Sequence, residues 1–287
     1  MYKFIGIGLC SLISLSAYAQ KLDTQAHRGG RGLMPENTIP AMINAIDLGV
    51  KTLEMDTHIT RDSLVVVSHD DAINPAHSFK PDGSELEGNQ VKPYVLFQMP
   101  YAEIRSFDIG SKFYKDFPEQ KKMPAHIPLL SALIDSAEAH AKLKGRTLYY
   151  NIETKSKAGG DGINHPDPQT FVRLLMQVIQ QKGITDRVMI QSFDVRTLQV
   201  LHKQYPDIKT SLLVSKNSLE ANLDMLGFTP DIYSPLYTLV EAPLVKACHE
   251  KGIKLIPWTV NTREDITRLQ ALGVDGIISD YPDLFFN

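Results

Sequence analysis

The chain has 287 residues, enough for one large domain or two small ones with a full hydrophobic core. Its composition, 43% hydrophobic and 22% charged, is that of an ordinary globular protein. The formal net charge of −3 lacks the basic excess of nucleic-acid-binding proteins, so we expect no nucleic acid partner.

The first nineteen residues have the pattern of a secretory signal peptide. Lys3 gives a short positive region, residues 4–15 are uncharged and mostly apolar, and Ala17-Tyr18-Ala19 is a small-x-small cleavage site. The apolar run is too short for a permanent helix across a bilayer of about 30 Å. We therefore expect an exported protein, periplasmic or secreted, without a stable membrane anchor and with its domain over residues 20–287.

In the rest of the chain, short apolar runs alternate with longer helical patterns. Strands are expected at Thr24–Ala26, Lys51–Met55, Leu64–Val67, Thr147–Ile152, Val188–Gln191, Thr210–Val214, Asp231–Tyr233, Lys254–Trp258 and Gly276–Ser279. Apolar spacing of i, i+3, i+4 predicts helices, for example over Ala41–Ile46, Leu129–Leu143, Phe171–Ile179, Leu198–Tyr205 and Ile266–Leu272. Several helical patterns end in glycine, which favours a left-handed C-terminal cap. This rhythm is typical of βα units around a buried parallel sheet.

About eight such units predict an α/β fold of the (β/α)₈ TIM-barrel class. Nine strand candidates compete for eight places, so one is wrongly assigned or lies outside the barrel. The run 64–67 follows the second strand with no helix between them. The stretch 71–125 is irregular, with one helical pattern over 101–107, and predicts a small insertion after an early strand.

Three carboxylates stand at the ends of two predicted strands. Residues two apart in a strand face the same side, so Glu54 projects with Asp56, and Glu153 projects with Lys155. Each carboxylate alone is better explained by a solvated strand end or a helix cap. Together they form a set of hard oxygen ligands that suits Ca²⁺ or Mg²⁺.

Two histidines, His27 and His69, directly follow strand-like residues. An imidazole titrates near neutral pH, so the two can act as a general acid and base. His58, two residues after Asp56, is left out of the predicted site because it falls beyond the expected strand end. The other histidines stand in no comparable cluster of charged strand-end residues and are predicted to be ordinary: His77, His126, His140, His165, His202 and His249.

Arg28 and Lys155 are the candidates for contacting phosphate, Arg as a planar fork and Lys as a point charge. The glycines at 29, 30 and 32 would let backbone amides approach an anion, although a turn needs glycine in any case. Asn37 or Thr38 is expected to cap a helix that begins near Pro40.

These motifs occur in one order along nearly the whole of residues 20–287. They are His27-Arg28-Gly29, Pro35-Glu36-Asn37-Thr38, Glu54-x-Asp56, Thr60-x-Asp62, His69-Asp70, Ile127-Pro128-Leu129-Leu130, Asn151-Ile152-Glu153-x-Lys155, Gln191-Ser192-Phe193, Trp258-Thr259-Val260-Asn261 and the run from Gly273 to Asp280. In this order they resemble the glycerophosphodiester phosphodiesterase family, a (β/α)₈ branch of the phospholipase C-like phosphodiesterases. Ser63 departs from the family, which prefers glycine after Asp62.

The resemblance implies metal-dependent hydrolysis of a small glycerophosphodiester to sn-glycerol 3-phosphate and an alcohol, with one divalent cation, Ca²⁺ or Mg²⁺. The implied roles are metal binding for Glu54, Asp56 and Glu153, acid–base catalysis for His27 and His69, phosphate contact for Arg28 and Lys155, and a place in the substrate pocket for Gln191, Phe193 and Trp258.

Two alternatives remain open at the level of sequence. One is lysophospholipase D-like cleavage of a lipid phosphodiester, which would need the apolar residues of the insertion to form a binding surface. These residues, which we expect instead to pack against the barrel, are Phe79, Tyr94, Val95, Leu96, Phe97, Tyr101 and Phe113. The other is a non-catalytic phosphodiester-binding protein, although binding alone needs no pair of histidines.

Overall fold

The computed structural model describes residues 22–87 and 94–286, so the predicted signal peptide over 1–19 lies outside it. The strands are β1 Asp23–Ala26, β2 Thr52–Ile59, β3 Val65–Val67, β4 Tyr149–Thr154, β5 Val188–Ser192, β6 Lys209–Val214, β7 Ile232–Pro235, β8 Lys254–Leu255 and β9 Gly276–Ser279. The helices are α1 Ile39–Leu48, α2 Tyr101–Ile104, α3 Leu130–Leu143, α4 Pro168–Lys182, α5 Val195–Gln204, α6 Leu219–Leu226, α7 Ala242–Glu250 and α8 Arg263–Ala271. Within the described ranges, no helix has the length and hydrophobicity needed to cross a bilayer.

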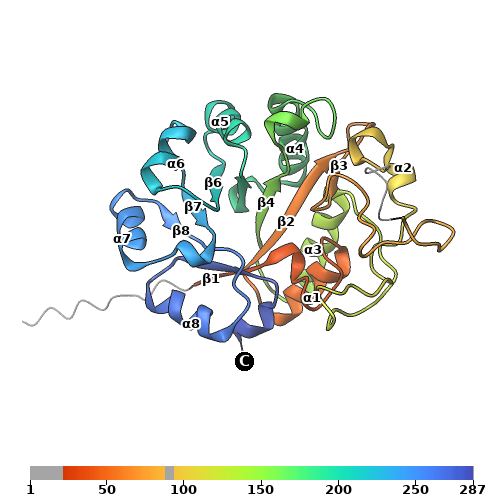
Figure 1. The fold of residues 1–287 in the computed structure, drawn as a ribbon, viewed down its shortest axis with the longest axis horizontal. Helices are drawn as coiled ribbons and strands as arrows, with labels where there is room; N and C mark the ends of the chain where they lie inside the picture. Colours follow the sequence, from red (N-terminus) through yellow and green to blue (C-terminus); the bar gives the residue numbers. More distant parts are fainter. Residues whose placement is uncertain (1–21, 88–93, 287) are drawn as a thin grey trace, which may run out of the picture.

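A ring of parallel strands forms the centre of the molecule, with helices around it (Figure 1). The strand order is β8-β7-β6-β5-β4-β2-β1-β9, and every neighbouring pair along it is parallel. Between the two ends of this order, the Asp275 amide donates to the Leu255 carbonyl at 2.9 Å and the Ile278 amide to the Pro257 carbonyl at 3.0 Å. The predicted (β/α)₈ barrel is confirmed.

The ninth strand candidate lies outside the ring. β3 pairs with β2 in the antiparallel sense, with Thr57 opposite Val67. A tight turn over residues 60–64 makes this hairpin, and in it Ser63 adopts a φ of 61°. Glycine adopts this left-handed region without a steric penalty, which explains physically why the family prefers glycine there.

Several predicted strands have different ends in the structure. The strand predicted over 51–55 continues to Ile59, so Asp56 and His58 lie within it, and the expectation that His58 falls beyond the strand end is wrong. β4 continues to Thr154, so Glu153 lies within the strand rather than beyond it. The strand predicted over 254–258 is regular only to Leu255, although the Ile256 and Trp258 amides still donate to the Tyr233 and Pro235 carbonyls of β7. Pro257 has no amide hydrogen and therefore offers no donor on the β9 side.

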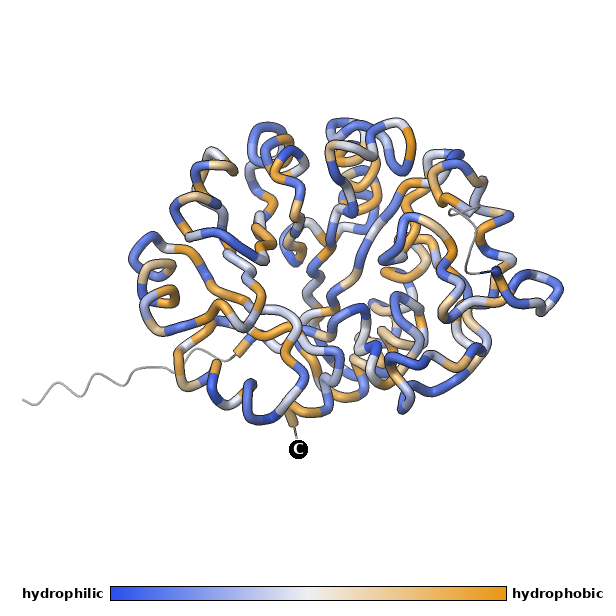
Figure 2. The backbone as a smooth tube through the Cα atoms, viewed as in Figure 1, coloured by the Kyte–Doolittle hydropathy of each residue, from blue (hydrophilic) through white to orange (hydrophobic). Residues whose placement is uncertain are grey.

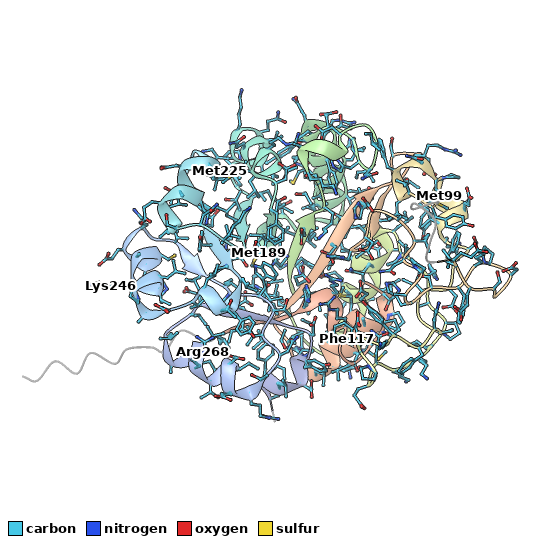
Figure 3. All side chains as sticks on the ribbon, viewed as in Figure 1. Met99, Phe117, Met189, Met225, Lys246 and Arg268 are labelled. Carbon is cyan, nitrogen blue, oxygen red and sulfur yellow. The ribbon has the colours of Figure 1, made fainter. Side chains whose placement is uncertain are left out.

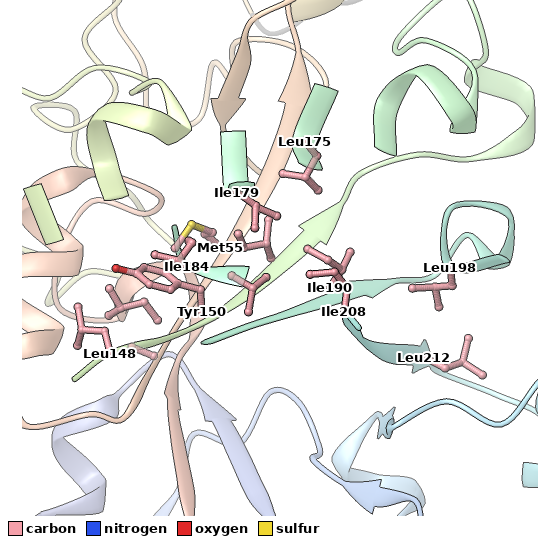
Figure 4. Packing of buried hydrophobic residues seen from close by; sticks show 14 of the residues in the cluster. Met55, Leu148, Tyr150, Leu175, Ile179, Ile184, Ile190, Leu198, Ile208 and Leu212 are labelled. Atoms are coloured by element: carbon pink, nitrogen blue, oxygen red, sulfur yellow. The ribbon is translucent and has the colours of Figure 1, made fainter. Parts of the chain in front are cut away.

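Alternate strand residues face two separate cores. Met55 of β2 and Ile190 of β5 point outward and pack with Leu175 and Ile179 of α4 (Figure 4). Along the outer helices hydrophobic residues alternate with hydrophilic ones, as expected for helices that bury one face (Figure 2). Inside the ring, a small apolar cluster consists of Met189, Ile232, Ile256 and Ile278. Met189 lies near the middle of the ring in Figure 3.

The insertion between β3 and α3 has a hydrophobic core of its own, which includes Ile73, Leu96, Ile104 and Phe107. The helix in it spans Tyr101–Ile104 and is shorter than the pattern over 101–107 suggested. Most of the apolar side chains that a lipid surface would need are packed away. Val95 and Leu96 are buried, Tyr94 and Tyr101 pack against the insertion's core, Phe97 packs against the barrel core, and Phe113 is 53% exposed.

Candidate active site

The three predicted metal ligands lie together at the carboxyl ends of two neighbouring strands. β2 and β4 are adjacent in the ring, and their register places Asp56 directly beside Glu153. One oxygen each from Glu54, Asp56 and Glu153 lie within 4.8 Å of one another, and all three residues are buried. We refer to these three residues as the acidic triad.

The loop after β1 holds two of these carboxylates in place. The Arg28 amide donates to Glu54 Oε2 at 2.7 Å, and Asn37 Nδ2 donates to Asp56 Oδ2 at 2.8 Å. Arg28 has a φ of 53° and Asn37 a φ of 56°, a region that non-glycine residues seldom adopt. Both strained residues therefore direct a donor at the acidic triad. Backbone strain of this kind is typical of functional sites.

Two basic side chains, Lys155 and Arg28, lie against the acidic triad. Lys155 Nζ is 3.1 Å from Glu153 Oε1 and 3.6 Å from Asp56 Oδ1. Arg28 Nε is 3.3 Å from Asp56 Oδ2, and its Nη1 is 2.9 Å from Glu36 Oε1. Both predicted phosphate-contacting residues are thus at the site, each paired with carboxylates.

Burial and close charges shift the pKa values of all three carboxyls of the acidic triad. Burial and the neighbouring Asp56 raise the pKa of Glu54 well above its usual value. Burial also raises the pKa of Glu153 to about 7, although Lys155 opposes the shift. Burial acts in the same direction on Asp56, but Arg28 and Lys155 hold the pKa of that carboxyl below its usual range.

The chemistry of the donor set fits one hard divalent cation. The three carboxylates of the acidic triad face two basic side chains, Arg28 and Lys155, and Arg28 is shared with Glu36. The buried Asp56 Oδ1 has no hydrogen-bond partner within the described residues. An oxygen-only set that includes a buried carboxylate oxygen without a hydrogen-bond donor suits Ca²⁺ or Mg²⁺.

The first predicted catalytic histidine has an acidic partner. His27 Nδ1 lies 2.5 Å from Asp280 Oδ1, and Asp280 is held in turn by Arg31 Nε at 2.7 Å and Asn261 Nδ2 at 2.8 Å. Burial lowers the pKa of His27, although Asp280 opposes the shift. Sequence reasoning gave Asp280 no role, but its place directly after β9 is the kind of strand end that singled out the other carboxylates.

The second predicted histidine, His69, follows β3 and has a side chain that is 33% exposed, with Nδ1 3.1 Å from Asp70 Oδ1. Its carbonyl lies 3.1 Å from His58 Nε2. His58 is buried, and burial lowers its pKa to about 4. His58, which sequence reasoning left out, therefore packs beneath the His69 loop as a neutral imidazole.

A cavity of about 340 Å³ opens beside the acidic triad. Its lining includes His58, His69, Glu153, Lys155, His165 and Phe193. Phe193 is 46% exposed and meets Trp258 edge to face, with ring centroids 5.3 Å apart. Trp258 is fixed by its Nε1, which donates to the Ser234 carbonyl at 2.9 Å.

Gln191 has a different environment from the other predicted pocket residues. It is buried, and its Nε2 donates to Glu54 Oε1 at 2.7 Å. The structure therefore places its side chain against a predicted metal ligand and outside the cavity lining.

The glycine-rich turn serves packing. A Cβ at Gly29 would lie 2.8 Å from Ala41 Cβ, and the Gly30 and Gly32 amides donate to the His27 and Asp280 carbonyls. These two amides are thus used within the fold. Thr38 is the helix cap, since its Oγ1 accepts from the Ala41 amide at 3.2 Å.

Comparison with known proteins identifies relatives along almost the whole chain. The model of the glycerophosphoryl diester phosphodiesterase family matches residues 27–284. A glycerophosphodiester phosphodiesterase of Caldanaerobacter subterraneus is 31% identical over 262 residues, which are 91% of this chain and 95% of the relative. A human lysophospholipase D is 24% identical, with 90% of this chain and 82% of the relative covered.

Solved structures have the same fold. A putative glycerophosphoryl diester phosphodiesterase from Silicibacter pomeroyi superposes with a TM-score of 0.82 at 30% identity, over 92% of this chain and 91% of that one. A phosphodiesterase from Oleispira antarctica, solved in complex with the product sn-glycerol-3-phosphate, has a TM-score of 0.72 at 22% identity, over 91% and 94% of the two chains.

Proposed function

The chain belongs to the glycerophosphoryl diester phosphodiesterase family, and we propose that it hydrolyses glycerophosphodiesters to sn-glycerol 3-phosphate and an alcohol by metal-dependent, histidine-assisted catalysis. The observation that supports this most strongly is the buried acidic triad, which lies next to two cations at the carboxyl ends of the barrel strands. This is the end of the barrel at which enzymes of this fold have their active sites.

Glu54, Asp56 and Glu153 would hold one divalent cation, Ca²⁺ or Mg²⁺. When bound, such an ion acts as a Lewis acid toward a phosphoryl oxygen and lowers the pKa of a bound hydroxyl. Arg28 and Lys155 supply further positive charge for the phosphate from the sides of the acidic triad.

The two histidines move the protons. The glycerol 2-hydroxyl attacks phosphorus and gives its proton to His27, while His69 donates a proton to the alkoxide that leaves as the P–O bond breaks. Water then opens the cyclic phosphate with the roles reversed. His27 suits the first step because burial lowers its pKa, which keeps it neutral near pH 7, and because Asp280 on Nδ1 leaves Nε2 for the proton.

The substrate groups are assigned by what surrounds the acidic triad. Trp258 and Phe193 form an edge-to-face pair that provides an apolar wall for the glycerol and its neighbouring carbon atoms. Gln191 contacts the acidic triad rather than the substrate, because its Nε2 donates to Glu54.

Lysophospholipase D-like cleavage of a lipid is the second candidate, because a human relative at 24% identity has that name. The packing of the insertion's apolar residues within its own core favours the water-soluble substrate. A binding protein without catalysis is a weaker candidate, since the His27–Asp280 pair has no purpose in simple capture.

The test uses the purified chain with glycerophosphocholine and, separately, lysophosphatidylcholine. Glycerol 3-phosphate and free choline from the first substrate would support the proposal. Phosphocholine as the product would show that the other ester bond is cleaved. Faster turnover of the lysolipid would favour the second candidate, and stoichiometric binding without product would favour a binding protein.

We also propose export, which rests on the charge and cleavage pattern of residues 1–19. Fractionation of cells that produce the full chain, with sequencing of the mature N-terminus, tests this. Cleavage after Ala19 and recovery outside the cytoplasm are expected, and an uncleaved cytoplasmic chain would contradict it.

A further inference from the structure

A chain of hydrogen-bonded amides runs through the barrel interior and ends at the acidic triad. Asn151 Nδ2 donates to Gln25 Oε1 at 2.8 Å and also to Gln191 Oε1 at 3.0 Å. The two glutamines donate outward, Gln25 Nε2 to Asp23 Oδ2 at 2.9 Å and Gln191 Nε2 to Glu54 Oε1 at 2.7 Å. Asn151 is thus the central member of a chain with a carboxylate at each end.

A row of amide side chains is unusual in the interior of a barrel. Branched apolar side chains usually dominate the interior of this fold, and the other side of this interior is apolar, with Ile232, Ile256 and Ile278. Gln25, Asn151 and Gln191 are all buried. The three buried amides satisfy one another by hydrogen bonds, and one end of the network is bonded to a predicted metal ligand, Glu54.

The row of hydrogen-bonded side-chain amides has a fixed donor-to-acceptor direction. A side-chain amide has one accepting and one donating end, and the donating end of Asn151 faces the accepting ends of both glutamines. If Gln191 rotated by half a turn, its NH₂ group would meet that of Asn151 and its oxygen would meet the Glu54 carboxylate. Asn151 therefore fixes the orientation in which Gln191 donates to Glu54.

The side-chain oxygen of Asn151 is buried and, unlike its NH₂ group, makes no hydrogen bond within the described residues. The contribution of the side chain therefore lies in its two N–H donors, and the loss of these donors is what an experiment has to measure.

We propose that Asn151 is a positioning residue of the metal site: by fixing the direction of the Gln191 amide, it holds Glu54 in the orientation needed to bind the cation. This rests on the proposed function, since it requires the acidic triad to bind a metal. With the Arg28 amide on Oε2 and Gln191 on Oε1, both oxygens of Glu54 are held, and its flexible side chain has one orientation. Partners of this kind typically change metal affinity by about 10- to 100-fold.

The experiment titrates Ca²⁺ and Mg²⁺ into metal-free protein by calorimetry. Asn151→Leu removes both donors, and Asn151→Asp keeps the shape but replaces the donors with acceptors. Asn222→Leu is the matched control, because Asn222 is a buried amide that donates to Tyr233 Oη at 2.8 Å outside the amide chain. We expect a Kd about 10- to 100-fold weaker for both Asn151 variants and an unchanged Kd for Asn222→Leu.

A folded Asn151→Leu protein with a Kd within about twofold of wild type would overturn the proposal. If that variant does not fold, Gln191→Leu removes the donor next to Glu54, and an unchanged Kd there would overturn it equally. If the wild type releases product with metal while these Kd values stay the same, the inference fails and the proposed function stands. If the wild type binds neither cation, the proposed function fails and the inference fails with it.

Discussion

His27 Nδ1 and Asp280 Oδ1 lie 2.5 Å apart, although the two residues are separated by 253 positions in the chain. They meet because β1 and β9 are neighbours in the ring, with Ala26 beside Ser279, and each residue directly follows one of these strands. The closure of the barrel therefore brings His27 and Asp280 together. In the proposed mechanism, Asp280 would fix the tautomer of His27 and stabilise the imidazolium that forms when His27 accepts a proton.

Asp280→Asn should lower kcat by about 10²–10⁴-fold with a much smaller change in KM, because an amide can hold His27 in the wrong tautomer. Steady-state kinetics on glycerophosphocholine measure this. Asp47→Asn is a matched control, since Asp47 pairs with His140 at 2.9 Å on the surface. Equal effects of the two substitutions would contradict the role of Asp280.

His27→Ala and His69→Ala should each reduce kcat by about 10²–10⁴-fold, the usual contribution of one positioned proton-transfer group. His249→Ala is the control, because His249 pairs with Asp275 away from the acidic triad. Near-normal turnover in either site variant would remove that histidine from the mechanism.

The sequence predicts the barrel because its local patterns agree with the fold. The glycines at 49 and 183, for example, have the positive φ values expected of helix C-caps. Alternation within strands also brings Glu54 and Asp56 to one face. What it does not give is contact between distant segments: the Asp280 partner of His27 and the enclosure of Gln191 both depend on how the ring closes.

The stability of the metal-free protein should depend on Glu153. Its folded pKa of about 7 lies above its ordinary value of 4.5, so between these pH values the native state binds more protons than the unfolded state. Its contribution to stability is therefore lost as pH rises through this window. In urea unfolding with EDTA, the free energy of unfolding of Glu153→Gln should rise relative to that of wild type from about pH 5 to pH 8. A difference in free energy that does not change with pH would contradict this.

Ser63→Gly should stabilise the protein by up to about 1 kcal/mol, or raise Tm by about 2–4 °C, because Ser63 has a left-handed φ of 61°. Thermal unfolding measures this, and kcat should not change. Ser136→Gly is the contrasting control, since Ser136 lies within α3 and glycine there should destabilise the helix. A loss of stability in Ser63→Gly would contradict the strain at that turn.

The central claim is that the acidic triad holds a cation required for turnover. The most direct measurement follows glycerol 3-phosphate release from glycerophosphocholine by wild type and Glu54→Gln, first in EDTA and then as Ca²⁺ or Mg²⁺ is restored. We predict that EDTA abolishes release, that one of the two ions restores it in wild type, and that Glu54→Gln needs far more metal or stays inactive. Full turnover of the wild type in EDTA, or an unchanged metal requirement in Glu54→Gln, would contradict the account.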